Sequence, residues 1–481
     1  MPHSREGWNF HTGYLELPEI LYRRVDPTPV AAPRLLALNG PLCAELGLDA
    51  EALREGAGLA TLAGNAIPPG STPLAQAYAG HQFGHFTMLG DGRAILMGEQ
   101  IAPDGRRWDI QWKGSGRTPF SRGGDGRAAV GPMLREYLVS EALHALGIPT
   151  TRSLAVVATG ETVLRDGPLP GAVLVRVASS HLRVGTLEFA SALGDSGALK
   201  TLIEYTNARH GIPAGKNPAR ALLEACIQRQ SRLVAEWMGV GFVHGVMNTD
   251  NMALSGETID YGPCAFVDRF RSDAVFSSID RHGRYAYRNQ PSIAAWNLAR
   301  LAEAVLPAWT GDHPLEEANE CLRAFESTFQ EAWLSVFRRK FGLRDSGVND
   351  AGWIEQVISE IESAQADWTN TFHSLAGLVE DSTAPQGLPG EWCREWRARL
   401  KRSFPSTSEA VTALKHANPA VVPRNLAVES VLENASRAGE LAGFHALFEA
   451  VTRPFVADNL PADWLLPPPA GTPPYRTFCG T

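Results

Sequence analysis

The chain passes from a strand-like to a helical residue pattern along its length, and this change restricts its possible folds more than any other feature. Residues 86–113 alternate and turn as β structure does, and "RAILMGEQI", "APDG" and "RWDIQWKG" predict two strands joined by a turn. From about residue 190 the apolar residues recur at helical spacing, as in "ARALLEACIQRQSRLVAEWMG". A β-rich part followed by a larger helical part predicts an α+β fold with two lobes and extra C-terminal helices.

Other segments carry clear local signals. The segment around 33–55 predicts a short helix, and "PMLREYLVSEALHALGI" predicts a helix that begins at Pro132 and ends at Gly147. The stretches "RSLAVVATGETVLR" and "GAVLVRVASSHLRVGTLEF" predict strands, and the tail "LPPPAGTPPYRTFCGT" predicts no regular structure of its own. We divide the chain into an N-terminal extension packed on the core (1–75) and a β-rich lobe (76–183). A helical lobe with metal and catalytic loops (184–300) and a helical region with a cysteine-bearing tail (301–481) follow.

Composition excludes several classes of protein. With 481 residues the chain is long enough for two or three structural units. A formal net charge of −8 without a basic block argues against a nucleic-acid partner. No long apolar run and no signal-peptide pattern are visible, so we expect a cytoplasmic protein without a membrane partner. The six cysteines lack a CxxC motif, which argues against a zinc site or a disulfide scaffold; Cys479 stands apart in a tail that we expect to be exposed.

The stretches "HGVMNTDN" at 244–251 and "DYG" at 260–262 form the strongest chemical motif. Enzymes of the protein-kinase type carry H-x-D-x-x-x-x-N and a later Asp-aromatic-Gly turn, whose Asn and second Asp hold magnesium on a nucleotide. Asn251 and Asp260 match these oxygen ligands, but Val246 occupies the position of the catalytic aspartate. Two ordinary turns are the alternative, since Asn, Asp and Gly favour turns. The preceding helix pattern and the strand-like "ALSGETID" favour the metal site and a kinase-like layout.

Lys113 closes a predicted strand, and Glu136 lies in the helix predicted from Pro132. In kinases a strand Lys and a helix Glu form a pair that brings the ammonium group to phosphate oxygens. The alternative is a surface lysine and a glutamate that faces water near a helix start, where the helix dipole favours an acid. The order of loop, Lys, Glu and metal motif along the chain favours the pair.

Two glycine-rich turns are candidate phosphate-binding segments. "GDGR" at 90–93 allows close backbone approach to a ligand, but such a turn is more often simply part of a hairpin. "RGGDGR" at 122–127 leads toward a predicted helix start, where free backbone amides and arginines bind anions. Asp125 in this loop suits a ribose hydroxyl, an amine or a metal better than a phosphate.

Arg176 and Arg183 flank "RVASSHLR", where the chain crosses between the predicted lobes and where a kinase holds adenine. Guanidinium groups pair with phosphates, so two inward arginines would imply a reversed nucleotide with its terminal phosphates deep in the site. The alternative is a pair of surface arginines bound to nearby acids such as Glu188. From the residues alone, we favour this alternative.

Several longer stretches resemble the selenoprotein O family of kinase-like protein adenylyltransferases. They are "YAGHQFGHFTMLGDGRA", "WDIQWKGSGRTPFSRGGDGRA", "REYLVSEALHALGIPTTRSL", "HGVMNTDNMALSGETIDYGP" and the terminal "RTFCGT". The resemblance covers most of 78–268 and the C-terminus. It implies a kinase-like fold that binds ATP in a flipped orientation and transfers AMP to Ser, Thr or Tyr of proteins, including itself. UMP transfer from UTP is a further possibility of the family.

The resemblance also assigns roles to residues. It implies that Asp250 is the proton acceptor, which explains the valine at position 246, because a flipped nucleotide presents its α-phosphate to a different acid. It implies Mg²⁺, or Mn²⁺ in its place, on Asn251 and Asp260. The nucleotide-binding residues that it implies are Gly90, Gly92, Arg93, Lys113, Asp125, Gly126, Arg176, Arg183 and Asp260, with Glu136 orienting Lys113.

The family carries selenocysteine or cysteine at the position of Cys479, and some members form a regulatory disulfide with a later loop cysteine. Here the corresponding stretch, "SDAVFSS", has no cysteine, so the nearest loop thiol, Cys264, is the candidate partner. Two other functions stay open: a small-molecule kinase of the aminoglycoside-kinase type, against which the missing loop aspartate counts, and an inactive nucleotide-binding scaffold.

Overall fold

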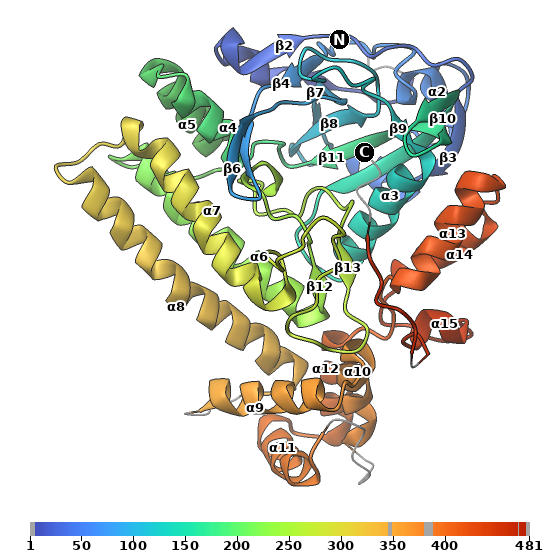
Figure 1. Ribbon diagram of the computed structural model, residues 1–481, viewed down its shortest axis with the longest axis vertical. Coiled ribbons are helices and arrows are strands. Elements are labelled where there is room, and N and C mark those ends of the chain that lie inside the picture. The colour runs from blue at the N-terminus through green and yellow to red at the C-terminus, as the bar shows by residue number, and fades with distance from the viewer. Residues whose placement is uncertain (1–4, 345–348, 380–387, 470, 478–481) are drawn as a thin grey trace.

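An antiparallel sheet occupies the N-terminal part of the chain, and helices form most of the rest (Figure 1). The computed structural model describes residues 5–344, 349–379, 388–469 and 471–477. This arrangement confirms the predicted α+β class. No helix in these ranges is long and apolar enough to cross a membrane.

Within the described residues the main sheet has nine strands, all paired in antiparallel fashion. The central hairpin joins β7 (Ala94–Ile101) to β8 (Arg107–Lys113), as the alternating pattern predicts. The order is β2 (Tyr22–Arg24), β4 (Leu74–Gln76), β7, β8, β11 (Pro168–Ala178), β10 (Arg152–Leu164) and β3 (Arg34–Leu38). β1 (Phe10–His11) pairs with β7, and β9 (Ala128–Ala129) pairs with β11. The predicted N-terminal extension therefore supplies strands to the same sheet.

Helix α3 (Val130–Ala145) packs against β10 and β11, and α6 (Pro218–Val240) forms the centre of the helical part. Local sequence explains the limits of α6. Asn217 caps its first turn by accepting a hydrogen bond from the backbone N–H of Arg220, and Pro218 suits the first helical position. Gly241 ends the helix at a φ of 72°, a left-handed conformation that costs glycine little.

The other helices follow the chain order. Helices α1 (Gly40–Leu46) and α2 (Gly56–Leu62) lie between β3 and β4 along the chain. The helical part contains α4 (Val184–Ala192), α5 (Ser196–Arg209), α7 (Gln290–Val305) and α8 (Pro314–Lys340). Next come α9 (Asp350–Ser363), α10 (Trp368–Leu378), α11 (Gly390–Ser403) and α12 (Thr407–Ala417). The last are α13 (Asn425–Arg437), α14 (Ala442–Val451) and α15 (Ala462–Leu465), and α13 and α14 return to pack on α3.

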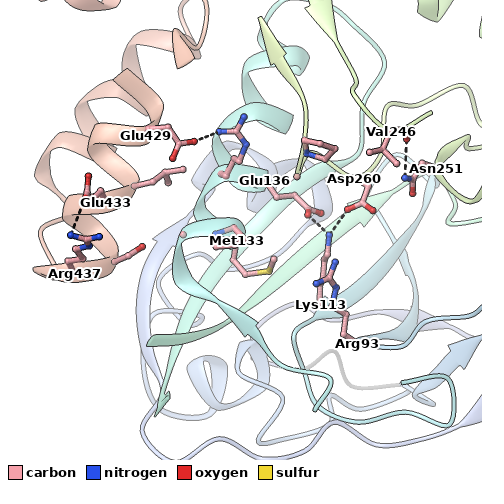
Figure 2. A pocket seen from close by; sticks show the side chains of 17 residues that line it. Arg93, Lys113, Met133, Glu136, Val246, Asn251, Asp260, Glu429, Glu433 and Arg437 are labelled. Atoms are coloured by element: carbon pink, nitrogen blue, oxygen red, sulfur yellow. Dashed lines mark hydrogen bonds and ion pairs between the residues drawn. The ribbon is translucent and has the colours of Figure 1, made fainter. Parts of the chain in front are cut away.

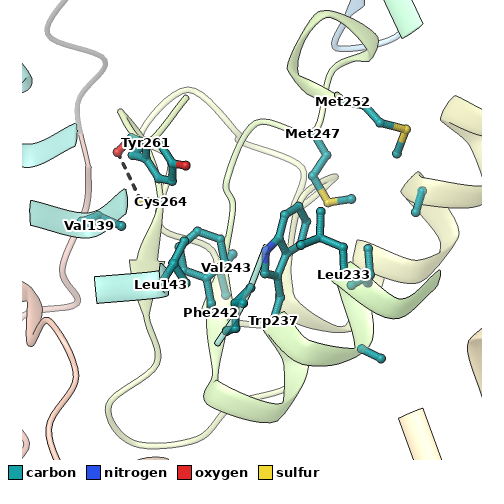
Figure 3. Close-up of a cluster of buried hydrophobic side chains, with 14 of the residues drawn as sticks. Val139, Leu143, Leu233, Trp237, Phe242, Val243, Met247, Met252, Tyr261 and Cys264 are labelled. Carbon is teal, nitrogen blue, oxygen red and sulfur yellow. Dashed lines mark hydrogen bonds between the residues drawn. The ribbon is translucent and has the colours of Figure 1, made fainter. Parts of the chain in front are cut away.

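A buried apolar cluster joins α3, α6 and the loops of the metal motif (Figure 3). Trp237 on α6, Phe242 and Met247 are each at most 3% exposed. Tyr261, the aromatic residue of "DYG", is fully buried, and its hydroxyl donates a hydrogen bond of 2.6 Å to the carbonyl of Thr258. The loops that carry the candidate ligands therefore rest on a packed core, which fixes their backbone.

Two local predictions are wrong, and the short helix predicted around 33–55 is confirmed for only part of that segment. The segment 33–55 begins with the strand β3 before the short helix α1, because its first apolar residues pair with β10. Residues 184–189 lie in α4 and form no strand. Since every residue from Val184 to Ala190 is buried, Thr186 and Glu188 included, the polar residues there do not mark a solvent face, and periodicity cannot separate a buried helix from a strand. "ALSGETID" makes only isolated bridges, Ala253 to Arg183 and Thr258 to Thr150.

Candidate active site

Asn251 and Asp260 lie on neighbouring loops and present oxygen atoms to the same cavity. Asn251 belongs to a short 3-10 turn at Thr249–Asn251, and its amide nitrogen donates a hydrogen bond of 3.1 Å to the carbonyl of Val246. No donor among the described residues reaches its Oδ1 or the Oδ2 of Asp260, so both oxygens are free for a ligand. Asp260 has a φ of 71°, a strained value for a residue with a side chain. Two free oxygens fit a hard divalent cation whose other ligands come from phosphates and water.

The structure brings Lys113 and Glu136 together, as Figure 2 shows. The Lys113 ammonium group donates to Glu136 Oε2 at 2.5 Å and to Asp260 Oδ1 at 2.8 Å. Burial opposes ionisation of Asp260, but the positive charges of Lys113, Arg93 and Arg176 outweigh it and hold the pKa of this carboxyl well below its usual range. Asp260 is therefore ionised at neutral pH, as a metal ligand must be.

A continuous series of buried polar groups leads from this pair to the loop that carries Asp250 and Asn251. Arg176 donates from Nη1 to Glu136 Oε1 at 3.1 Å and from Nη2 to Gln111 Oε1 at 2.5 Å. The amide nitrogen of Gln111 donates to Asp91 Oδ2 at 3.1 Å, and Asp91 Oδ1 lies 3.9 Å from Arg183 Nη2. Arg183 Nη1 in turn donates to the backbone carbonyl of Asp250 at 2.9 Å. Each charged group in this series has a partner, which buried charges require.

Arg176 and Arg183 are 3% and 4% exposed, so the interpretation of both as surface arginines is wrong. Neither binds Glu188, which instead contacts the His81 ring and accepts a hydrogen bond from the Thr249 hydroxyl. Arg183 also stacks on the ring of Tyr78, 4.5 Å from its centroid. The two guanidinium groups use only part of their five N–H donors on protein atoms, so donors remain for an anion.

Asp250 lies in a tight, buried environment and is 7% exposed. Its Oδ2 accepts a long hydrogen bond of 3.4 Å from the Gln82 amide, whereas its buried Oδ1 has no hydrogen-bond partner among the described residues. A Cβ on Gly80 would lie only 2.3 Å from that oxygen, so glycine is required at this close approach. Burial raises the pKa of the Asp250 carboxyl to about 6, although the Arg183 charge acts in the opposite direction. A carboxyl with a raised pKa and a free oxygen is suited to accept a proton.

The glycine-rich turns pack against each other. A Cβ on Gly90 would lie 2.4 Å from the Phe120 ring, and one on Gly92 would lie 2.9 Å from the Phe120 carbonyl. Gly126 has a φ of 68° and approaches the Gly116 carbonyl closely, so the loop before α3 is folded back on itself. Asp125 forms an ion pair with the guanidinium group of Arg165 at 3.0 Å.

A cavity of about 360 Å³ borders the Lys113–Asp260 pair and extends past the start of α3 to α13 (Figure 2). Val246 lines it where a kinase would place its base. Arg93, Lys113, Glu136, Asn251 and Asp260 among the candidate residues line this cavity. The candidates that lie outside its lining are Gly90, Gly92, Asp125, Gly126, Arg176, Arg183 and Asp250.

Sequence reasoning missed Asp91 and Gln111. Both are buried, at 2% and 0% exposure, and both link the two arginines. A signal was present, because Asp109, Gln111 and Lys113 alternate in β8 and therefore point to the same face of the sheet. Three polar residues on one face of a central strand indicate a polar site on that face.

The C-terminal tail docks beside the candidate site through Tyr475 and Thr477, so the expectation of an exposed tail is wrong for these two residues, whereas residues 471–474 and Arg476 are exposed. Thr477 is 3% exposed, and its hydroxyl donates to the carbonyl of Pro263 at 2.9 Å. The Tyr475 hydroxyl donates to Glu429 on α13 at 2.5 Å. Arg135 of α3 also binds Glu429, and it donates to the carbonyl of Cys264 at 2.6 Å. Through Arg135, α3 is therefore joined to the loop that follows Asp260.

The redox pair of Cys479 and Cys264 stays a prediction, since Cys479 lies outside the described residues. Cys264 is 1% exposed, and burial raises the pKa of its thiol to about 11. A buried thiol with a raised pKa forms little thiolate at neutral pH and reacts slowly with a disulfide partner.

Comparisons with known proteins show the family to which this chain is similar. Residues 6–452 match the model of the family "Protein adenylyltransferase SelO". The chain is 50% identical over 484 residues to "Protein nucleotidyltransferase YdiU" of Bacillus mycoides (strain KBAB4), with 99% of both chains covered. The protein of the same name from Alkaliphilus metalliredigens (strain QYMF) is 50% identical over 483 residues, covering 99% of this chain and 98% of that protein.

The chain belongs to the SelO family, and it is a protein nucleotidyltransferase. The predicted resemblance to this family is therefore confirmed. The class implies a nucleotide substrate.

Proposed function

We propose that this chain transfers AMP from ATP to Ser, Thr or Tyr hydroxyls of proteins, itself included, with the nucleotide bound in reverse relative to a protein kinase. The observation that carries the proposal is the burial of Arg176 and Arg183 beside the candidate ligands. The positive charge of Arg176 lowers the pKa of Asp260, and Arg183 binds the backbone of Asp250. Two buried guanidinium groups suit phosphate oxygens better than a purine ring.

The fold that we propose for this chemistry is the two-lobed fold of protein kinases. Three residues support this fold, and they follow one another along the chain in the order found in kinases: Lys113 on a strand, Glu136 on a helix and Asp260 in a turn. Hydrogen bonds from Lys113 to Glu136 and to Asp260 join the three side chains. The first lobe would comprise the sheet with α3, and the second would begin near α4. We keep the division at residues 75, 183 and 300 as part of this proposal.

Asn251 and Asp260 would hold a divalent cation, Mg²⁺ or Mn²⁺, through their free oxygens. The bound cation would supply positive charge that stabilises the phosphate oxygens during transfer. Lys113, held by Glu136, would bind the leaving phosphates together with Arg176 and Arg183. The glycine-rich turns, with Arg93, Asp125 and Gly126, would contact the rest of the nucleotide. Because these phosphate contacts do not depend on the base, UTP is a second candidate donor.

The reaction that we propose forms one P–O bond and breaks another. The acceptor hydroxyl oxygen attacks the α-phosphorus, and the bond from that phosphorus to the oxygen bridging to the β-phosphate breaks. The hydroxyl proton passes to Asp250, and pyrophosphate leaves with the electron pair. Val246 carries no titratable group, which is consistent with an acceptor proton taken up by Asp250 instead.

Paired labelling experiments test this function. The chain is incubated with a divalent cation and ATP labelled at the α- or the γ-phosphorus, with a cell extract as protein acceptor. We expect label on protein, including the chain itself, from α-labelled ATP only, with one pyrophosphate released per AMP transferred. Transfer of the γ-label by the wild-type protein would contradict the proposal and favour a kinase.

A further inference from the structure

A small hairpin outside the main sheet lies against the loop of residues 248–250, which includes Asp250. β5 (Ala79–Gln82) and β6 (His85–Met88) pair only with each other in the part of the chain that the structure describes. Phe83 and Gly84 form the two-residue turn, and their φ values of 51° and 89° match the turn type that suits twisted hairpins. Figure 1 shows this hairpin, with β6 labelled, extending from the sheet toward α7.

The outer edge of β6 is free for pairing. The backbone N–H of Leu89 donates to the carbonyl of Tyr78 at 2.9 Å, and antiparallel pairing alternates from there. Residues 85 and 87 therefore bond to β5, while the N–H and C=O groups of Phe86 and Met88 face outward. The side chains of these two residues are also exposed, by 46% and 45%. Proteins usually protect such edges, so an open edge with large apolar side chains indicates a docking surface.

The hairpin is attached directly to the candidate catalytic residues. The N–H of His81 donates to the Thr249 hydroxyl at 2.7 Å, and the N–H of Phe83 donates to Asn248 Oδ1 at 3.1 Å. The Gln82 amide reaches Asp250, as described above. A strand added to β6 would lie about 10 Å from β5, two strand spacings away. Asp250 Oδ1 lies against Gly80 of β5, so a docked segment must continue for about three residues of extended chain across the hairpin to bring a hydroxyl near Asp250.

Basic and aromatic groups flank the open edge. The His81 ring contacts both the Phe86 ring and the Trp296 ring of α7, each at 5.3 Å between centroids. Arg284 and Arg300 lie over the Trp296 ring, at 4.8 and 4.9 Å. Arg300 pairs with a glutamate, whereas Arg284 forms no ion pair with any residue that the structure describes. An arginine that has no acidic partner among the described residues and lies beside apolar side chains favours an acidic partner.

We propose that the β6 edge surface, formed by Phe86, Met88, Trp296 and Arg284, docks the acceptor protein. The occupant is an extended segment that adds a strand to β6, places an apolar side chain on Phe86 and Met88, and sets an acidic residue beside Arg284. This inference rests on the proposed function, since it assigns the site of the protein substrate in that reaction.

The first test removes the apolar side chains. Peptides with a single central Ser, Thr or Tyr and varied flanking residues serve as acceptors, with α-labelled ATP as donor. We expect the double variant Phe86→Ala/Met88→Ala to lower kcat/KM for preferred peptides about tenfold or more, with ATP affinity unchanged. The matched control is Leu164→Ala/Leu169→Ala, which removes two exposed leucines from the β10–β11 hairpin and should leave transfer unaltered.

The second test separates backbone pairing from side-chain contact. Met88→Pro removes an outward N–H and leaves the bonds to β5 in place, so it should reduce peptide transfer more than Met88→Ala does. Thermal unfolding by circular dichroism checks that each variant folds. Equal transfer by the two variants would contradict strand addition.

The third test uses charge. Wild type should prefer peptides with Asp or Glu near the acceptor, and Arg284→Glu should shift that preference toward Lys and Arg. Arg402→Glu, at an exposed position of α11, is the control and should not change the preference. Unchanged preference in Arg284→Glu, or wild-type transfer by the apolar double variant, would overturn the docking site alone. No α-label on any acceptor with wild type would overturn the proposed function and this inference with it.

Discussion

The cavity beside Asp260 has two walls that differ in burial. On the inner wall the side chains of Lys113 and Glu136 are 6% and 4% exposed. They belong to the series of buried polar contacts that leads to Arg183. On the outer wall Glu433 and Arg437 of α13 form an ion pair whose side chains are 58% and 81% exposed. Buried charges depend on their partners, whereas exposed ion pairs contribute about 0–1 kcal/mol. The inner wall should therefore be sensitive to substitution and the outer wall tolerant.

Removal of Asp260 should have the largest effect. Asp260→Ala deletes a candidate metal ligand and the partner of Lys113, so we expect transfer from α-labelled ATP to be abolished and cation-dependent ATP binding to be greatly weakened. The outer-wall variant Arg437→Ala is the control, and its activity should stay within about twofold of wild type. Full turnover by Asp260→Ala would remove this residue from the mechanism.

Asp250 should behave differently from Asp260. Asp250→Asn keeps the shape of the side chain but cannot accept the proton, so kcat should fall about a hundredfold or more. ATP affinity, measured by calorimetry, should change little, because Asp250 contacts Arg183 through its backbone carbonyl. A collapse of affinity would make Asp250 a ligand or a structural residue.

Gln111 should show an intermediate effect on nucleotide binding. Gln111→Leu leaves Nε and Nη2 of Arg176 without their acceptor, although Nη1 still binds Glu136. It also removes one of the two donors to Asp91 Oδ2, and each buried group left unsatisfied costs about 1–3 kcal/mol. We expect roughly tenfold weaker ATP binding and a lower unfolding temperature. Ser436→Ala on the outer wall is the matched control. Wild-type affinity in Gln111→Leu would show that the two arginines do not need this link.

Lys340 offers a contrast, because it is buried without an acid. It is 4% exposed and lies over the Phe372 ring, and no carboxylate of the described residues forms an ion pair with it. Burial lowers the pKa of its ammonium group to about 7. Below pH 7 both folded and unfolded chains are charged there, and the folded state bears the burial cost; above pH 7 the folded state loses the proton and stability rises. Lys340→Met should therefore raise the unfolding temperature by a few degrees at pH 6 and less at pH 9. An equal shift at both pH values would contradict this.

The sequence predicted those parts of the site that depend on spacing. A loop motif fixes the separation of Asn251 and Asp260, and the structure places both at one cavity. The hairpin that carries Lys113 is confirmed, because its strands alternate in the sequence. The sequence did not predict burial. It favoured surface arginines at 176 and 183, because nothing local distinguishes a buried guanidinium group from an exposed one. The α4 segment and the docking of Thr477 were missed for a similar reason, since both depend on contacts between distant parts of the chain.

The orientation of the nucleotide is the central claim, and a structure of the complex tests it most directly. The chain would be crystallised with Mg²⁺ and an ATP analogue whose bridging oxygen between the α- and β-phosphorus is replaced by methylene. We predict γ-phosphate oxygens within hydrogen-bond distance of Arg176 and Arg183, and the α-phosphorus next to Asp250. An adenine ring against Arg176 and Arg183, with the γ-phosphate at the cavity mouth, would contradict the account.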